Sequence, residues 1–118
     1  MRVLAFEDHY DIEAILVAAG VQTVDLVIEQ RWNSSDALDW IRRFAPDVLL
    51  LDHFMPPKTG YEVLNALLRA DIPRPSRIVA MSSASEKNHA MVALGADEGV
   101  VKFDLASLPF WPKTTGEI

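Results

Sequence analysis

The sequence predicts a doubly wound α/β domain in which five parallel strands lie in the order 2-1-3-4-5 and helices cover both faces. Short, almost continuously apolar runs, typical of strands buried on both faces, alternate with segments of helical periodicity. This alternation requires right-handed crossovers between parallel strands. The length of 118 residues suits one hydrophobic core. We therefore expect residues 1–118 to form a single domain.

The first expected strand, residues 3–6, is apolar throughout, and so are those expected at residues 48–51, 78–81 and 100–101. The second strand along the chain, residues 23–30, differs because its apolar residues alternate with mostly polar ones. A half-polar strand has one face or edge toward water. We therefore place this strand at an edge of the sheet.

The first helix is expected over residues 12–19, where apolar residues recur on one face before Gly20 stops the helix. Either Asp8 or Asp11 could cap its N-terminus, because a carboxylate there accepts a hydrogen bond from a free backbone N–H. The same residue types can also bind a cation, so the role of Asp8 is left open at this point.

The second helix is expected over residues 37–44, where apolar residues occur at i, i+3, i+4 and i+7. The polar residues 33–35, Asn-Ser-Ser, can cap this helix, and Pro46 ends it. A third helix, marked by leucines at helical spacing, follows Gly60 and closes before Pro73. Both helices therefore fill the connections that parallel strands need.

A fourth helix is expected over residues 85–94, with a glycine after it. The last helix is expected to be short or broken, because residues 104–108 allow only one turn before Pro109 and Pro112. The residues after Pro112 are poor continuations of a helix. We therefore predict an irregular C-terminal segment over residues 103–118.

Residues 108–111 of this segment include Phe110 and Trp111. A short last helix leaves part of the sheet face beside the first helix without cover, and a large exposed apolar patch usually marks an interface. We expect residues 108–111 either to fold back over this gap or to bury themselves in a second subunit; the remaining alternative is a longer chain whose further residues complete the last helix. The second alternative would give a homodimer through the C-terminal segment.

Composition excludes several classes of protein. Eleven Lys and Arg against seventeen Asp and Glu give a net charge of −6, which disfavours nucleic acid as a partner. The chain has no cysteine, so disulfides, cysteine zinc sites and thiol catalysis are excluded. No apolar run is long enough to span a membrane, and the acidic residues near the start leave no room for a signal peptide. We expect a cytoplasmic protein.

Acidic residues follow the two strands between which the strand order reverses, the point where ligands bind in open α/β sheets. Glu7 and Asp8 follow the first strand, and Asp52 ends the third. Three converging carboxylates must either take up a proton or hold a cation, and Mg²⁺ prefers such oxygen ligands. Ser82 and Lys102 follow the fourth and fifth strands. The set suits phosphoryl transfer to a carboxylate, with metal and lysine neutralising the transferred group.

These residues resemble the receiver domain of two-component response regulators, which has a flavodoxin-like fold, over essentially the whole chain up to residue 102. The pair at residues 7–8 resembles the acidic pair of the family. Residues 52–60, Asp-His-Phe-Met-Pro-Pro-Lys-Thr-Gly, resemble the phosphoacceptor segment. Ser82 stands where the family keeps Ser or Thr, and residues 95–102 resemble the approach to its lysine. The fragments occur in the family's order and spacing.

The resemblance implies that Asp52 accepts a phosphoryl group from a phosphohistidine on a sensor histidine kinase or a phosphotransfer protein. It also implies a Mg²⁺ site made by Glu7, Asp8 and Asp52, with the backbone carbonyl of Phe54 as a further ligand. Such a domain modifies itself and is a signalling switch in a two-component system or phosphorelay. It is not a turnover enzyme.

By the same resemblance, Ser82 hydrogen-bonds the acyl phosphate in the active state and Lys102 pairs with it. The output is a rearranged surface around the fourth helix and fifth strand that contacts a downstream protein partner.

The chain departs from the family at three places. Gly99 stands three residues before Lys102, where the family usually has an aromatic residue that swings inward on activation. Phe103 follows Lys102 in place of the usual proline, and the last helix is expected to be short or broken. The usual coupling between Ser82 and an aromatic residue therefore cannot operate. An alternative function is a phosphorylation-independent scaffold or dimerisation module of the same fold.

A Mg²⁺-dependent phosphatase with an aspartate nucleophile is a weaker alternative. It needs a general acid two residues beyond the nucleophile, and Phe54 and Tyr10 occupy that position after the candidate aspartates. His9 and His53 flank the acids, but neighbours along a strand point to opposite sides. We expect these histidines to be exposed loop residues and not metal ligands.

Overall fold

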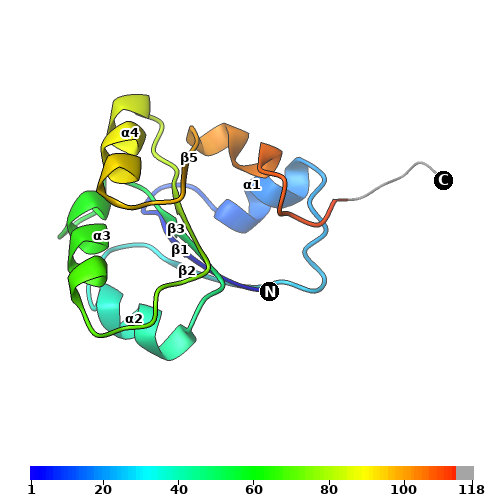
Figure 1. Ribbon diagram of the computed structural model, residues 1–118. Coiled ribbons are helices and arrows are strands. Elements are labelled where there is room, and N and C mark those ends of the chain that lie inside the picture. The colour runs from blue at the N-terminus through cyan, green and yellow to red at the C-terminus, as the bar shows by residue number, and fades with distance from the viewer. Residues whose placement is uncertain (114–118) are drawn as a thin grey trace.

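Five parallel strands form a single sheet in the order β2-β1-β3-β4-β5, as the sequence predicts (Figure 1). The structure is a computed structural model that describes residues 1–113. The strands are β1 (Arg2–Phe6), β2 (Val27–Arg31), β3 (Val48–Leu51), β4 (Arg77–Ala80) and β5 (Glu98–Gly99). The central strands β1, β3 and β4 lie within one residue of their predicted bounds.

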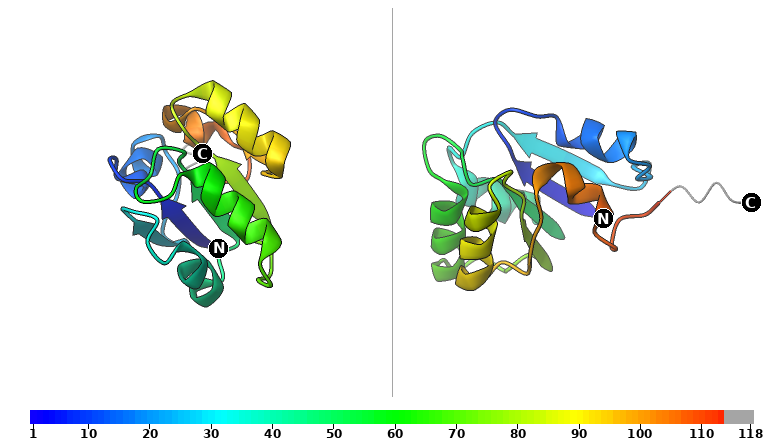
Figure 2. Two further views of the ribbon diagram at one scale, coloured as in Figure 1. Left: turned by 90° about the vertical axis from the view of Figure 1, so that its left-hand side faces the viewer. Right: turned by 90° about the horizontal axis from the view of Figure 1, so that it is seen from above.

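Helices cover both faces of the sheet (Figures 1 and 2). They are α1 (Ile12–Ala18), α2 (Ala37–Phe44), α3 (Gly60–Arg69), α4 (Ser85–Leu94) and the 3₁₀ helix η1 (Lys102–Ser107). Helices α2, α3 and α4 pack on one face, and α1 and η1 pack on the other. None of the helices in residues 1–113 has the length and apolar character that a membrane crossing requires.

Two hydrophobic cores lie on the two faces of the sheet because successive strand residues point to opposite sides. In β1, Leu4 and Phe6 face the core under α2 and α3, whereas Val3 and Ala5 face the core under α1 and η1. The same alternation runs through β3 and β4, and these residues are essentially inaccessible to water. Each fully buried Leu, Val or Phe contributes about 1.5–3 kcal/mol to folding.

The outer strands begin or end elsewhere than the sequence predicts. Strand β2 is at the edge, as expected, but it begins at Val27 and not at residue 23, because the N–H of Leu26 closes a turn on the carbonyl of Thr23 at 3.0 Å. Strand β5 is Glu98–Gly99 and not residues 100–101. The N–H of Val100 makes the last bond to β4, and the chain then turns into η1.

The helix caps settle one open question and correct another expectation. Asp11 caps α1, with its carboxylate accepting a hydrogen bond from the N–H of Ala14 at 3.1 Å, which leaves Asp8 free for another role. The predicted cap of α2 by residues 33–35 is wrong. The cap residue is Asp36 in a left-handed conformation (φ 56°), without a side-chain cap bond.

Ser34 does not cap α2 but joins two loops by hydrogen bonds. Its hydroxyl donates to the carbonyl of Lys58 at 2.7 Å and accepts from the N–H of the same residue at 2.8 Å. The loop after β2 is thereby joined to the loop after β3. Because Ser34 is buried, both bonds satisfy polar groups that water does not reach.

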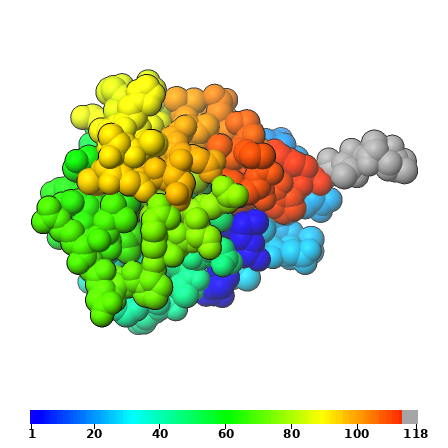
Figure 3. Space-filling model, viewed as in Figure 1, coloured from blue at the N-terminus to red at the C-terminus, as the bar shows by residue number. Residues whose placement is uncertain are grey.

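The last helix is short, as predicted, and the chain after it folds back on the domain (Figure 3). Trp111 is only 3% exposed and its indole N–H donates to the carbonyl of Leu105 at 3.0 Å. The carbonyl of Pro112 accepts from the N–H of Gln22 at 2.8 Å, beside α1. The segment thus covers the gap beside α1 within its own chain. The homodimer stays a prediction, and residues 114–118 lie outside the described part.

Candidate functional site

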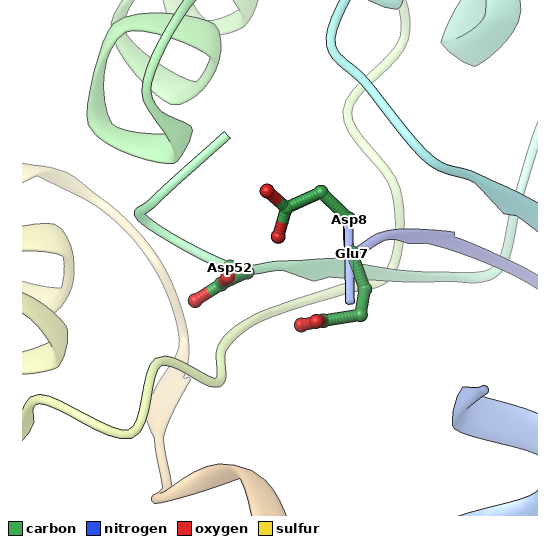
Figure 4. Close-up of side chains that lie close together, drawn as sticks. All are labelled: Glu7, Asp8 and Asp52. Atoms are coloured by element: carbon green, nitrogen blue, oxygen red, sulfur yellow. The ribbon is translucent and has the colours of Figure 1, made fainter. Parts of the chain in front are cut away.

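Three carboxylates meet at the carboxyl ends of β1 and β3. Glu7 and Asp8 directly follow β1, and Asp52 directly follows β3. The two strands are neighbours in register, with Phe6 opposite Leu51, so the residues that follow them are brought together. Ligand oxygens of the three residues all lie within 4.8 Å of one another, and the carboxylates turn toward the same side (Figure 4). The structure therefore places the predicted trio in one pocket.

Glu7 is a fully buried carboxylate whose two oxygens have separate partners. Oε2 accepts hydrogen bonds from the backbone N–H groups of His9 at 3.0 Å and Tyr10 at 3.1 Å. Oε1 lies 2.8 Å from Nζ of Lys102. The turn after β1 is thus folded around this carboxylate, which fixes Glu7 at the base of the pocket.

Lys102 is the first residue of η1 and is only 4% exposed. Its ammonium also lies 3.6 Å from Oδ2 of Asp52 and 5.1 Å from the centre of the Tyr10 ring. Burial alone would lower the pKa of Lys102, but the hydrogen bond to Glu7 and the charges of Asp52 and Glu7 outweigh burial and raise it. The side chain therefore stays a cation inside the pocket.

Asp52 is 3% exposed, and its Oδ1 has no hydrogen-bond partner among the described residues. Burial raises the pKa of Asp52; the Lys102 ammonium opposes this effect, and the charges of Glu7 and Asp8 add to it. One ammonium thus pairs with two of the three carboxylates of the trio. The pocket has negative charge left over and an oxygen without a partner.

This donor set fits a hard divalent cation. Carboxylate oxygens are the ligands that Mg²⁺ prefers, and Asp8, the exposed member of the trio, gives an ion access from solvent. The unpartnered Oδ1 of Asp52 is the buried oxygen that an ion would satisfy. The backbone carbonyl of Phe54 stays a predicted ligand, two residues farther along the loop that begins at Asp52.

Ser82 is fully buried just beyond the end of β4, the strand next to β3. Its hydroxyl oxygen accepts from the N–H of Ala84 at 3.1 Å. Its backbone N–H and carbonyl both bond the side chain of Asn88. Sequence reasoning did not single out Asn88. The available signal was that Asn88 precedes the buried Met91 by three residues, so the two share a helix face.

The two histidines near the carboxylates differ in their exposure to solvent. His9 is exposed, as predicted, and its ring packs edge-on to Tyr10 at 4.7 Å. His53 is half-buried, so the prediction of an exposed residue is wrong for it. Burial lowers the pKa of His53, and the charge of Lys87 lowers it further. Neither histidine belongs to the carboxylate trio.

The fold and the site define a doubly wound α/β domain with an acidic pocket and a lysine at the point where the strand order reverses. The chain belongs to the response regulator receiver domain family, whose model matches residues 3–106. Receiver domains operate in two-component signalling, bind Mg²⁺ at an acidic pocket, interact with histidine kinases and downstream effectors, and are generally not themselves enzymes.

Curated relatives are larger proteins. A protein-glutamate methylesterase/protein-glutamine glutaminase of Rhodopseudomonas palustris is 30% identical over 106 residues, which are 86% of this chain and 28% of the relative. One of Myxococcus xanthus is 35% identical over 95 residues, which are 79% of this chain and 26% of the relative. The chain thus spans about a quarter of the length of these relatives.

Solved structures share the fold. The response regulator domain of Thermotoga maritima CheB has a TM-score of 0.68 at 22% identity, covering 86% of this chain and 78% of that one. The phosphorylated cyanobacterial phytochrome response regulator RcpA has a TM-score of 0.71 at 20% identity, covering 89% and 87%. These likenesses confirm the flavodoxin-like arrangement.

Proposed function

We propose that this domain is a phosphoacceptor that takes a phosphoryl group onto Asp52 from a phosphohistidine of a sensor histidine kinase or phosphotransfer protein, and signals through protein–protein contacts. The observation that carries the proposal is Asp52 itself. It is a buried carboxylate with one oxygen lacking a hydrogen-bond partner in the described residues, beside a buried lysine and two further acids.

In the proposed step, a carboxylate oxygen of Asp52 attacks phosphorus and forms the O–P bond of an acyl phosphate. The N–P bond of the donor breaks, and its electron pair stays on the imidazole nitrogen. The Lys102 ammonium pairs with the phosphoryl oxygens, and the Ser82 hydroxyl donates a hydrogen bond to one of them. Glu7, Asp8, Asp52 and the backbone carbonyl of Phe54 would hold Mg²⁺, which would supply positive charge against the transferred group.

The test uses a small donor, acetyl phosphate or phosphoramidate, with Mg²⁺ and the intact chain. We expect a mass gain of one phosphoryl group that is lost at alkaline pH, because acyl phosphates hydrolyse there. Asp52→Asn should show no gain, whereas Asp71→Asn, a control at an exposed aspartate, should gain it fully. Absence of any gain in a chain shown to be folded would contradict the proposal.

That negative outcome would favour a phosphorylation-independent scaffold of the same fold. The observations in favour of it are Gly99 in place of an aromatic residue and a 3₁₀ helix in place of a full last helix. The phosphatase alternative has less support, because Phe54, two residues past Asp52, carries a half-exposed ring that cannot donate a proton.

A further inference from the structure

Asn88 lies on the inner face of α4 and is only 2% exposed. Its side-chain amide is fully engaged with backbone groups outside the helix. Oδ1 accepts from the N–H of Ser82 at 2.8 Å, and Nδ2 donates to the carbonyl of Ser82 at 2.8 Å and to the carbonyl of Val100 at 3.0 Å. One side chain therefore joins α4 to the residues that follow β4 and β5.

The contact between α4 and β5 is close because residue 99 has no side chain. A Cβ atom at Gly99 would lie 3.1 Å from Cβ of Asn88 and 3.3 Å from Cγ2 of Val92. These distances are tighter than ordinary van der Waals contact, so a larger side chain there would push α4 away. The space beside Gly99 is thus already occupied by Cβ of Asn88 and Cγ2 of Val92.

The two bonds between Asn88 and Ser82 form a closed pair, since the same amide holds both the N–H and the carbonyl of one residue. If the backbone of Ser82 moved alone, it would leave buried polar groups without partners, which is strongly unfavourable in a dry environment. Movement of Ser82 together with α4 keeps both bonds. The geometry therefore favours a concerted displacement.

We propose that Asn88 is the positioning residue that transmits the state of Asp52 from Ser82 to α4 and β5, in place of a mobile aromatic side chain. The inference rests on the proposed phosphorylation of Asp52. When the Ser82 hydroxyl turns to a phosphoryl oxygen, the backbone of Ser82 shifts, and the amide of Asn88 carries that shift into α4. The bond to Val100 carries it to the end of β5.

The test measures amide hydrogen exchange over α4 and β5 in the intact chain, with and without acetyl phosphate and Mg²⁺. We expect phosphorylation to change exchange in α4 by about tenfold in the unaltered chain, within the usual range of coupling between sites. In Asn88→Leu, which keeps the size and removes all three bonds, this change should fall below about twofold. All comparisons are made at equal phosphorylated fraction, measured by mass.

Three variants separate coupling from mere destabilisation. Ile72→Ala, a core change in the loop before β4, should lower stability and keep the response of α4. His89→Ala, on the exposed face of α4, should also keep it. Asn88→Asp is the second test variant if Asn88→Leu fails to fold: it keeps an acceptor for Ser82, loses both donated bonds, and should show a reduced response.

The outcomes are distinct. No mass gain in the unaltered chain overturns the phosphoacceptor function and the inference with it. A mass gain without any change of exchange in α4 overturns the inference alone. A full response of α4 in Asn88→Leu or Asn88→Asp overturns it as well, and a response equally weakened in Ile72→Ala would show that Asn88 acts only through stability.

Discussion

Nζ of Lys102 lies 2.8 Å from Oε1 of Glu7, closer than its 3.6 Å distance from Oδ2 of Asp52. Glu7 therefore holds the ammonium of Lys102 beside Asp52. The ammonium neutralises the charge of Asp52 only in part. The side chain of Lys102 thus lies next to the position that a phosphoryl group on Asp52 would occupy. We expect a short movement of the ammonium, which already lies 3.6 Å from Oδ2 of Asp52, to bring it to a phosphoryl group on that residue.

We predict that Lys102→Met destabilises the domain by about 3–5 kcal/mol, because it leaves two buried carboxylates without their cation. Mg²⁺ should restore part of the loss by supplying positive charge to the same oxygens. Chemical denaturation with and without Mg²⁺ measures both effects. Lys58→Met, at an exposed lysine, is the control and should change stability by less than about 0.5 kcal/mol. Equal losses in the two variants would contradict the assigned role.

We predict that Asp52→Asn stabilises the domain by about 1–2 kcal/mol when Mg²⁺ is absent, because it removes a buried charge that lacks full compensation. The pKa of Asp52 is raised, mainly by burial, which agrees with a carboxylate whose charge is not fully compensated. Mg²⁺ should raise the melting temperature of the unaltered chain and have little effect on the variant. A variant that melts earlier, or that Mg²⁺ stabilises as much as it does the unaltered chain, would refute the prediction.

We predict that Gly60→Ala destabilises the domain by about 3 kcal/mol or more, because a Cβ there would overlap the backbone carbonyl of Asp52. The first residue of α3 packs directly on the backbone of Asp52 and His53, and the N–H of Gly60 donates to the carbonyl of His53 at 2.9 Å. The variant should also accept phosphoryl groups more slowly, because Asp52 must shift.

Gly20→Ala provides the comparison for that change. A Cβ at Gly20 meets nothing within 4 Å, and only its positive φ of 88° opposes substitution. Its destabilisation should be about 1–2 kcal/mol, with phosphoryl uptake unchanged. If Gly60→Ala behaved no worse than Gly20→Ala in both denaturation and phosphorylation, the close approach to Asp52 would not matter.

We predict that Trp111→Ala destabilises the domain by about 3–5 kcal/mol, since the indole is buried against η1 and α1 and donates a hydrogen bond. Trp32→Ala, at a half-exposed tryptophan, is the matched control and should cost much less. Thermal denaturation compares the two. Light scattering on both variants tests the homodimer: association that persists in Trp111→Ala would show that residues 108–111 are not its interface.

The central strands were predictable because they are buried on both faces and therefore almost wholly apolar. Strand β5 was not, because the residues that pair are Glu98 and Gly99. Glu98 can be polar in a strand since its carboxylate pairs with Arg77 at the sheet edge, at 3.4 Å. The apolar residues Val100 and Val101 lead out of the sheet into η1.

The carboxylate trio and Lys102 were predictable because topology alone brings strand ends to a common edge. The spacing between Asn88 and Met91 indicates that Asn88 faces inward, but its hydrogen bonds were not predictable, because its partners are backbone groups, which leave no pattern in the sequence. The folding back of Trp111 was one of several alternatives, since an apolar segment can cover its own sheet or another chain. The folded structure decides which surface an apolar segment covers, and the spacing of its apolar residues does not.

The hydroxyl of Ser34 hydrogen-bonds both the N–H and the carbonyl of Lys58. It thereby joins the loop after β2 to the loop that carries Phe54. The stiffness of that loop is consequently not a property of its own nine-residue stretch, 52–60. It is shared with the loop after β2, because the backbone N–H of Ser34 also donates to the carbonyl of Pro56 at 2.8 Å. We therefore expect the two loops to move together.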